Sequence, residues 1–335
     1  ANKWFVRQRG PGHHAGHTMN QNSLPSSSGA VPAGLSAPVG AASLGSLAAL
    51  LLLAVMWGLS IPVTKLGLES MPPLTLTALR FAVAVPLLMV FTLGRARLPW
   101  HALPRVAALG VLGIGVGQVA QTYGVAGTSA SVGTVISAMI PVFIVFFAAL
   151  RLHQSVTRRQ QLGLVAAFVG ICMVGFGQGG EAAGLSGTTL AGVAFMLLSS
   201  LAIAFYYVWS VELTDAHGTA AVAAWSTLFG FLALLPWAGR EMAQTDFEVT
   251  AVAVGAAVYL GVVVTVAGLF LWLALLRVVA ARVAASVQYL QPLVGIAAAA
   301  VLFGDRLGLA FDVGVLLVLA GLALTLAPAR ANSAA

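Results

Sequence analysis

Two stretches of the chain align without a gap: residues 137–174 (SAMIPVFIVFFAALRLHQSVTRRQQLGLVAAFVGICMV) and residues 288–325 (QYLQPLVGIAAAAVLFGDRLGLAFDVGVLLVLAGLALT). The offset between them, from 137 to 288, is 151 residues. Extended upstream, this offset matches four pairs of glycine or proline: Gly110 with Gly261, Pro141 with Pro292, Gly163 with Gly314, and Gly170 with Gly321. Apolar stretches match easily by chance, so the constant spacing of these residues carries the argument. The chain is therefore an internal duplication.

The composition requires a lipid environment. Of the 335 residues, 60% are hydrophobic and 7% are charged, whereas soluble domains carry about 25% charged residues. The formal net charge is +7, but Lys and Arg lie in short clusters between apolar runs. Such clusters are typical of cytoplasmic loops and not of a nucleic-acid-binding face. We expect the protein to lie in a lipid bilayer and to bind no nucleic acid.

Charged and Gly/Pro-rich breaks divide the apolar sequence into ten runs. A bilayer core about 30 Å thick requires about 20 apolar residues per helix, and the runs are too long for barrel strands. The predicted fold is an all-α membrane protein with ten transmembrane helices, at 44–66, 73–93, 103–123, 128–150, 160–177, 189–211, 219–238, 249–273, 280–303 and 310–327. Each copy of the duplication holds five helices. Because five is odd, the second copy enters the membrane inverted, which is a transporter architecture.

The positive charges of the loops fall on one side. With a cytoplasmic N-terminus, twelve of the sixteen Lys and Arg residues fall inside, two fall outside (Arg240 and Arg306), and two lie within helices (Lys65 and Arg80). Lys and Arg concentrate in cytoplasmic loops, so we expect both termini in the cytoplasm. The twelve inside residues are Lys3, Arg7, Arg9, Arg95, Arg97, Arg105, Arg151, Arg158, Arg159, Arg277, Arg282 and Arg330.

Four parts follow from this division. Residues 1–42 are rich in Gly, Ser, Pro, Asn and His and are predicted to form a flexible cytoplasmic tail. Residues 43–178 and 179–328 are the two five-helix repeats, and residues 329–335 are a cytoplasmic C-terminal tail. The histidines of GPGHHAGH at 10–17 offer at most a weak metal site. The composition there favours a disordered tail, so we predict no metal centre.

Three motifs resemble one transporter family. They are WGLSIPVTK at 57–65, LTALRF at 76–81, and the pattern from Pro292 to Gly304-Asp305-Arg306, where that family usually has Gly-Glu. The first repeat departs from the pattern, because His153-Gln154-Ser155 stands in the equivalent place. On these motifs, residues 44–327 resemble the drug/metabolite transporter (DMT) superfamily in its ten-helix, EamA-type branch. Among its members the chain is most similar to bacterial YddG-type exporters of aromatic amino acids. The resemblance implies a transporter of the bacterial inner membrane.

Polar and aromatic side chains within the spans are the candidates for a solute site. Polar groups in a membrane helix are costly unless they face other helices or a wet cavity. Helical spacing puts Trp57, Ser60 and Thr64 on one face of the first span. The glutamines form i, i+3 pairs whose amides offer a zwitterion both a donor and an acceptor, although glutamines also link helices. The candidate substrate-binding residues are Trp57, Ser60, Thr64, Lys65, Gln118, Gln121, Tyr206, Ser210, Gln288, Tyr289 and Gln291.

Lys65 admits two interpretations. The preferred one is that its long stem carries the ammonium to the membrane surface beside Glu69. The other is that a bend at Pro62 turns Lys65 toward the cavity, as a partner for a solute carboxylate. Arg80, about two turns inside the second span, is interpreted as structural. Because proline removes a backbone hydrogen bond, we expect helix kinks at Pro62, Pro141 and Pro292.

Three classes of function compete. An intramembrane enzyme needs acid–base or nucleophilic groups at depth, and no predicted span carries a carboxylate near its middle. A passive scaffold has no need of paired polar faces on inverted repeats. We therefore predict no catalytic residues and no cofactor. We expect a monomeric transporter that exports small neutral or zwitterionic metabolites, including aromatic amino acids, by alternating access through a central cavity. The alternatives are an exporter of nucleosides, sugars or drugs, and a non-transporting scaffold.

Overall fold

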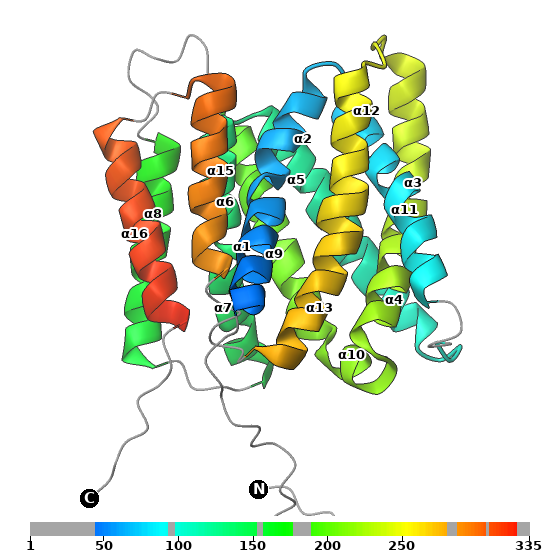
Figure 1. Ribbon diagram of the computed structural model, residues 1–335, viewed down its shortest axis with the longest axis horizontal. Helices are drawn as coiled ribbons and strands as arrows, with labels where there is room; N and C mark the ends of the chain where they lie inside the picture. The colour runs from blue at the N-terminus through cyan, green and yellow to red at the C-terminus, as the bar shows by residue number, and fades with distance from the viewer. Residues whose placement is uncertain are drawn as a thin grey trace, which may run out of the picture. The chain divides into compact units, whose positions relative to one another are not determined.

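The computed structural model describes residues 44–92, 98–152, 157–176, 189–279, 287–305 and 308–326. The predicted tails, 1–42 and 329–335, lie outside these ranges. Every regular element within them is a helix (Figure 1). Up to residue 176 the elements are α1 (Leu44–Gly58), α2 (Ser60–Leu68), α3 (Pro73–Thr92), α4 (Leu103–Leu109), η1 (Gly110–Gly115), α5 (Val116–Ala126), α6 (Ala130–Ser137), α7 (Ile140–Leu152) and α8 (Arg158–Phe176).

From residue 190 onward the order of helices continues. These are α9 (Leu190–Trp209), α10 (Val211–His217), α11 (Thr219–Gln244), α12 (Ala251–Val258), η2 (Tyr259–Ala267), α13 (Gly268–Val278), α15 (Val287–Phe303) and α16 (Leu309–Leu326). We call the end of the helices where α2 meets α3 the Glu69 end, and the opposite end the Arg151 end. In Figure 1 the Glu69 end is at the top.

Seven helical segments within the described ranges are long and apolar enough to cross a bilayer. They are Leu44–Leu68, Pro73–Thr92, Leu103–Ala126, Ala130–Arg151, Leu190–Trp209, Thr219–Gln244 and Ala251–Leu275. Two apolar helices, Leu290–Phe303 and Leu309–Thr325, are shorter. The α8 helix begins with four polar residues, Arg-Arg-Gln-Gln, which lowers its apolar character. The chain is thus an all-helical, multi-pass membrane protein.

Two of the long segments are interrupted near a proline. The first breaks at Leu59, three residues before Pro62, and the fourth breaks at Ala138–Met139, two residues before Pro141. Proline cannot donate to the carbonyl four residues earlier, so the helix loses a bond where each break lies. Pro292, in contrast, lies inside the uninterrupted helix α15. A helix break therefore lies close to two of the three prolines at which we expected a kink, Pro62 and Pro141.

Two π-helical segments occupy matching places in the duplication. The η1 segment begins at Gly110, and Gly261, which the 151-residue offset pairs with Gly110, lies in η2. Both glycines allow close backbone approach. A methyl group added at Gly261 would lie 2.7 Å from the carbonyl oxygen of Arg80 in α3, and one at Gly110 would meet the backbone of Ser226 in α11. Widened turns of this kind occur mostly as single insertions in α-helices, often at functional sites.

The last helix of each repeat packs against the other through glycines. Figure 1 shows α8 and α16 side by side. An added methyl group at Gly163 would lie 2.6 Å from the Gly321 carbonyl oxygen, and one at Gly170 would lie 2.6 Å from that of Gly314. The 151-residue offset pairs Gly163 with Gly314 and Gly170 with Gly321. It therefore maps the contact between Gly163 and Gly321 onto the contact between Gly314 and Gly170. Such reciprocal contacts are those of a twofold-related, antiparallel pair.

The turn between α5 and α6 exposes the polar ends of two helices, and three residues from other parts of the chain cover it. Lys65 Nζ donates to the carbonyl oxygens of Val125 at 3.0 Å, Ala126 at 3.3 Å and Thr128 at 2.6 Å. Asp305 Oδ2 accepts from the Ser131 N–H at 3.0 Å, and Thr189 donates its N–H to the Gly127 carbonyl at 2.8 Å. A cation at the C-terminus of one helix and a carboxylate at the N-terminus of the next match the helix dipoles.

Three backbone carbonyls hold the Lys65 ammonium at this turn. Neither interpretation of Lys65 included these acceptors, and both stay predictions. The sequence could not show these contacts, because the acceptors lie about sixty residues further along the chain.

We predict that Gly163→Ala destabilises the protein whereas Gly239→Ala does not. A Cβ atom at Gly163 would collide with the backbone of α16, and overpacking of this kind costs about 1–3 kcal/mol. Gly239 is also inside a helix, but nothing lies within 4 Å of its added Cβ atom, so alanine there should stabilise by about 0.5–1 kcal/mol. Thermal unfolding in detergent measures both. Equal unfolding temperatures for the two variants would contradict the close contact.

We further predict that Lys65→Ala lowers stability by about 1.5–3 kcal/mol, the value of a hydrogen bond to a charged group, and leaves solute affinity nearly unchanged. Arg240→Ala is the matched control, because the hydrogen bond that Arg240 makes within the described part of the chain is to Gln244 in its own helix, at 3.3 Å. Thermal unfolding and solute binding are measured on the same preparations. A well-folded Lys65→Ala protein that no longer binds solute would make Lys65 a solute ligand instead.

Candidate functional site

The described interior has a polar centre at Arg80, in the middle of α3. The Arg80 side chain is 8% exposed. Its Nη1 donates to Gln118 Oε1 of α5 at 2.6 Å. Its Nε and Nη2 donate to the hydroxyl of Thr265 in η2, at 3.2 Å and 3.1 Å. Gln118 comes from the first copy of the duplication and Thr265 from the second, so the guanidinium links the two copies inside the bundle.

The π-helical turn of η2 presents Thr265 to Arg80. The Thr265 hydroxyl donates to the Leu260 carbonyl, five residues earlier, at 2.8 Å, and therefore has its oxygen free to accept from Arg80. On the α1 side, Trp57 Nε1 donates to the Val264 carbonyl at 3.1 Å and the Tyr259 hydroxyl donates to the Met56 carbonyl at 3.0 Å. The η2 segment is thus fixed to α1 and to α3.

A column of polar side chains continues from Arg80 toward the Glu69 end. Gln118 and Thr122 lie one turn apart on α5, and the Thr122 hydroxyl lies 2.8 Å from that of Thr77 on α3. Beyond them, Glu241 accepts from the N–H and the hydroxyl of Thr75, at 2.7 Å and 2.9 Å. Its carboxylate therefore caps the N-terminus of α3, where a negative charge is favoured.

Glu241 corrects one expectation from the sequence. The seventh span was predicted to end at 238, with Glu241 in the following loop, but α11 continues to Gln244. Glu241 is consequently in the last helical turns, where its second carboxylate oxygen also accepts from the Tyr123 hydroxyl at 3.4 Å. The chain does carry a carboxylate inside a membrane helix, close to its end.

No ion pair reaches Arg80 within the described part of the chain. The one salt bridge there joins Arg151 to Glu212, at 2.9 Å. The contacts of Arg80 use three of its five N–H groups, which leaves one on Nη1 and one on Nη2 without an acceptor among the described residues. Gln118 and Thr265 are neutral, so the positive charge of Arg80 is uncompensated there.

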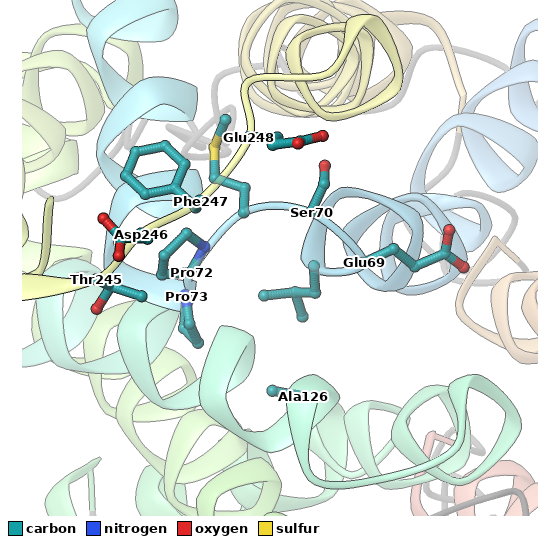
Figure 2. A pocket seen from close by; sticks show the side chains of 11 residues that line it. Glu69, Ser70, Pro72, Pro73, Ala126, Thr245, Asp246, Phe247 and Glu248 are labelled. Carbon is teal, nitrogen blue, oxygen red and sulfur yellow. The ribbon is translucent and has the colours of Figure 1, made fainter.

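A pocket of about 630 Å³ opens at the Glu69 end. Figure 2 shows that the turn between α2 and α3 forms one wall and that Thr245, Asp246, Phe247 and Glu248 form another. Three carboxylates line it, at Glu69, Asp246 and Glu248, and none of its lining residues is basic. A second pocket of about 520 Å³ is lined by apolar side chains and glycines of α3, η1, α5, α9 and α11. Among the described residues, none of the predicted substrate-binding residues lines either pocket.

The structure distributes the predicted aromatic residues over different helix contacts. Trp57 packs beside Trp272, with ring centroids 5.9 Å apart, in a cluster that includes Leu290. Tyr206 is buried in another cluster, near the Arg151 end, beside the η1 glycine Gly113. Since Trp57 packs on η2 and Tyr206 on η1, the two rings occupy corresponding places in the two copies. A shared chamber for them stays a prediction.

The remaining predicted residues are held in different ways. Ser60 is half-buried at the start of α2. Thr64 and Ser210 donate their hydroxyls to carbonyls of their own helices, Ser60 at 2.7 Å and Tyr207 at 3.2 Å. The side chains of Gln288 and Tyr289 lie outside the described part. Gln121 is half-buried in α5. Gln291 is half-buried in α15, and its Nε2 is buried with no hydrogen-bond partner among the described residues.

Sequence reasoning missed Thr265 and Glu241 and gave Arg80 only a structural role. The charge of Arg80 inside an apolar span was a signal of a functional role. Thr265 carried no such signal, because threonines are common in membrane helices and the π-helical turn that presents it depends on tertiary packing.

Comparison with known proteins agrees with this architecture. An uncharacterized transporter of Archaeoglobus fulgidus is 25% identical over 234 residues, which cover 70% of this chain and 81% of that protein. The uncharacterized transporter YdfC of Bacillus subtilis is 24% identical over 184 residues, 54% of this chain and 57% of that protein. A protein of known crystal structure aligns with a TM-score of 0.57 over 84% of this chain and 96% of its own; at 16% identity this shows a shared fold alone.

The family assignment covers nearly all of the membrane part. The EamA-like transporter family matches the chain twice, over residues 43–176 and 190–327. Two matches of this length account for both copies of the internal duplication. The chain therefore belongs to the EamA-like transporter family of the DMT superfamily and is a multi-pass membrane transporter, not an enzyme.

Proposed function

We propose that this transporter exports small zwitterionic metabolites, amino acids including aromatic ones, by alternating access between two inverted five-helix halves. The observation that carries the proposal is the polar centre at Arg80, because both halves contribute to it: Arg80 and Gln118 from one, Thr265 from the other. Alternating access requires one site shared by both halves near the bilayer midplane. A zwitterion offers such a centre a carboxylate and an ammonium.

The ten-helix, inverted arrangement rests on two features of the fold. The 151-residue offset maps the two glycine contacts between α8 and α16 onto each other, and η1 and η2 occupy equivalent places in the two copies. Boundaries at 43–178 and 179–328 assign five spans to each half. In this assignment several consecutive helices form one span together: α1 with α2, α4 to α5, α6 with α7, and α12 to α13.

The distribution of charge supports an orientation in a bacterial inner membrane. Arg105, Arg151, Arg158 and Arg159 belong to the Arg151 end, whereas Glu69, Asp246, Glu248 and Asp305 belong to the Glu69 end. Positive residues concentrate on the cytoplasmic side. The Arg151 end is then cytoplasmic, with both termini, and the pocket with three carboxylates opens to the outside.

The decisive assay is transport by the purified protein in liposomes. We expect labelled phenylalanine and other amino acids to exchange down their gradients faster than in protein-free liposomes, with nucleosides, sugars and lipophilic cations as the comparison set. A pH gradient is imposed in parallel, and we expect little accumulation from it, since Glu241 is held by Thr75 as a helix cap. Transport of nucleosides, sugars or cations without amino acids would reject the proposed substrate, and transport of no solute would favour a scaffold.

We also predict opposite effects for two glutamine variants. Gln291→Leu removes a buried donor that has no partner among the described residues, so stability should not fall. If that donor binds solute, affinity should fall about 10- to 100-fold, the equivalent of one charged hydrogen bond. Gln118→Leu removes the acceptor of Arg80 and should lower stability by about 1–3 kcal/mol. Unfolding temperature and solute affinity are measured for both; full affinity in Gln291→Leu would exclude Gln291 from the site.

A further inference from the structure

The guanidinium of Arg80 is a buried positive charge without a negative partner among the described residues. Its hydrogen-bond acceptors among the described residues are an amide oxygen and a hydroxyl, and the ring of Phe81 lies 5.9 Å from the guanidinium carbon. A buried charge is costly unless it is paired and hydrogen-bonded. Arg80 is hydrogen-bonded but not paired, so the charge is the feature that needs an explanation.

The nearest carboxylate along this polar column already has another function. Glu241 is bound to Thr75, five residues before Arg80 on α3, which is about 7.5 Å along the helix axis at 1.5 Å per residue. The other carboxylates of the described helices and turns lie toward the membrane surfaces. The described part of the chain therefore holds Arg80 in place without neutralising it.

A purely structural role does not require a guanidinium. Neutral donors are sufficient to link an amide oxygen and a threonine hydroxyl, and a neutral residue avoids the cost of a buried charge. Arginine differs in that its planar fork offers parallel N–H groups that match the two oxygens of a carboxylate. Within the described part of the chain, one N–H on Nη1 and one on Nη2 of Arg80 have no acceptor, so part of this fork is available.

We propose that Arg80 binds the carboxylate of the transported solute and so selects acids over their amides and amines. This inference rests on the proposed function and names the group that the polar centre recognises. Gln118 orients the guanidinium from the same half as Arg80, while Thr265 contacts it from the opposite half. When the halves move apart, the Thr265 contact is the one that opens, which gives the solute carboxylate access to Nε and Nη2 in addition to the unused N–H groups.

The first test uses the unaltered protein and matched ligands. Phenylalanine, phenylalaninamide and phenethylamine share a ring and an ammonium, but only the first has a carboxylate. Binding to detergent-purified protein is measured by calorimetry and by the rise in unfolding temperature. We expect phenylalanine to bind at least about 10-fold more tightly than the amide, the lower value for one charged hydrogen bond. Equal affinities for the acid and the amide would overturn the inference, and no variant is needed to obtain that result.

The second test assigns the preference to this residue. Arg80→Gln should bind the acid and the amide equally, and Arg80→Lys should retain part of the preference. Arg151→Gln is the matched control, because Arg151 is already paired with Glu212 at 2.9 Å, and it should keep the full preference. An acid preference that persists in Arg80→Gln would overturn the inference. If Arg80→Gln does not fold, the Arg80→Lys comparison and the matched-ligand measurement on the unaltered protein still decide whether Arg80 binds the carboxylate.

Two further ligands separate this inference from the proposed function. Phenylacetate has the carboxylate and the ring but no ammonium, and sodium chloride supplies a simple anion. Arg80-dependent binding of phenylacetate without binding of amino acids would reject amino acids as substrates and keep the carboxylate site. Amino-acid transport with equal affinity for the amides would keep the transport function and reject the site. Stabilisation by chloride equal to that by phenylacetate would assign Arg80 to an inorganic anion and overturn the inference.

Discussion

A backbone N–H or carbonyl left unpaired inside a bilayer costs several kcal/mol, and this constraint organises the protein around the places where its helices stop. The turn between α5 and α6 is the clearest case. Lys65 covers the last carbonyls of α5, Asp305 and the Ser129 hydroxyl cover the first N–H groups of α6, and Thr189 bonds the Gly127 carbonyl between them. Three segments far apart in sequence must meet there, which ties α2, α9 and the end of α15 to one point.

The same constraint gives glycine its role between the helices. Lipid tails are as apolar as leucine, so helices in a membrane associate through close packing and through hydrogen bonds, not through the hydrophobic effect. The paired glycines of α8 and α16 and those of η1 and η2 supply close packing. Arg80, Thr265 and Glu241 supply hydrogen bonds across the two copies. The most polar of these contacts, at Arg80, is also the one whose charge has no negative partner among the described residues.

A transporter must have contacts between its halves that are able to open. Backbone contacts between glycines are unsuited to this, because they depend on a fixed separation of two helices. The bonds of Thr265 to Arg80 are better suited, since a solute carboxylate is able to replace the hydroxyl oxygen as acceptor. In the proposed transport cycle, one half moves against the other about their shared axis. During this motion α8 and α16 stay packed, while Arg80 exchanges Thr265 for the solute as its partner.

The sequence by itself determined the membrane environment, the helical fold class and the duplication, because these depend on composition and on the spacing of proline and glycine. It also identified the transporter family, and it marked Arg80 and Lys65 as charges inside apolar spans. Only the tertiary structure decided what those charges contact. The acceptors of Lys65 lie about sixty residues away, Thr265 is presented by a π-helical turn, and Glu241 reaches Thr75 because α11 continues past its predicted end. Local sequence patterns record burial and periodicity, whereas a hydrogen bond between distant segments depends on how the helices pack.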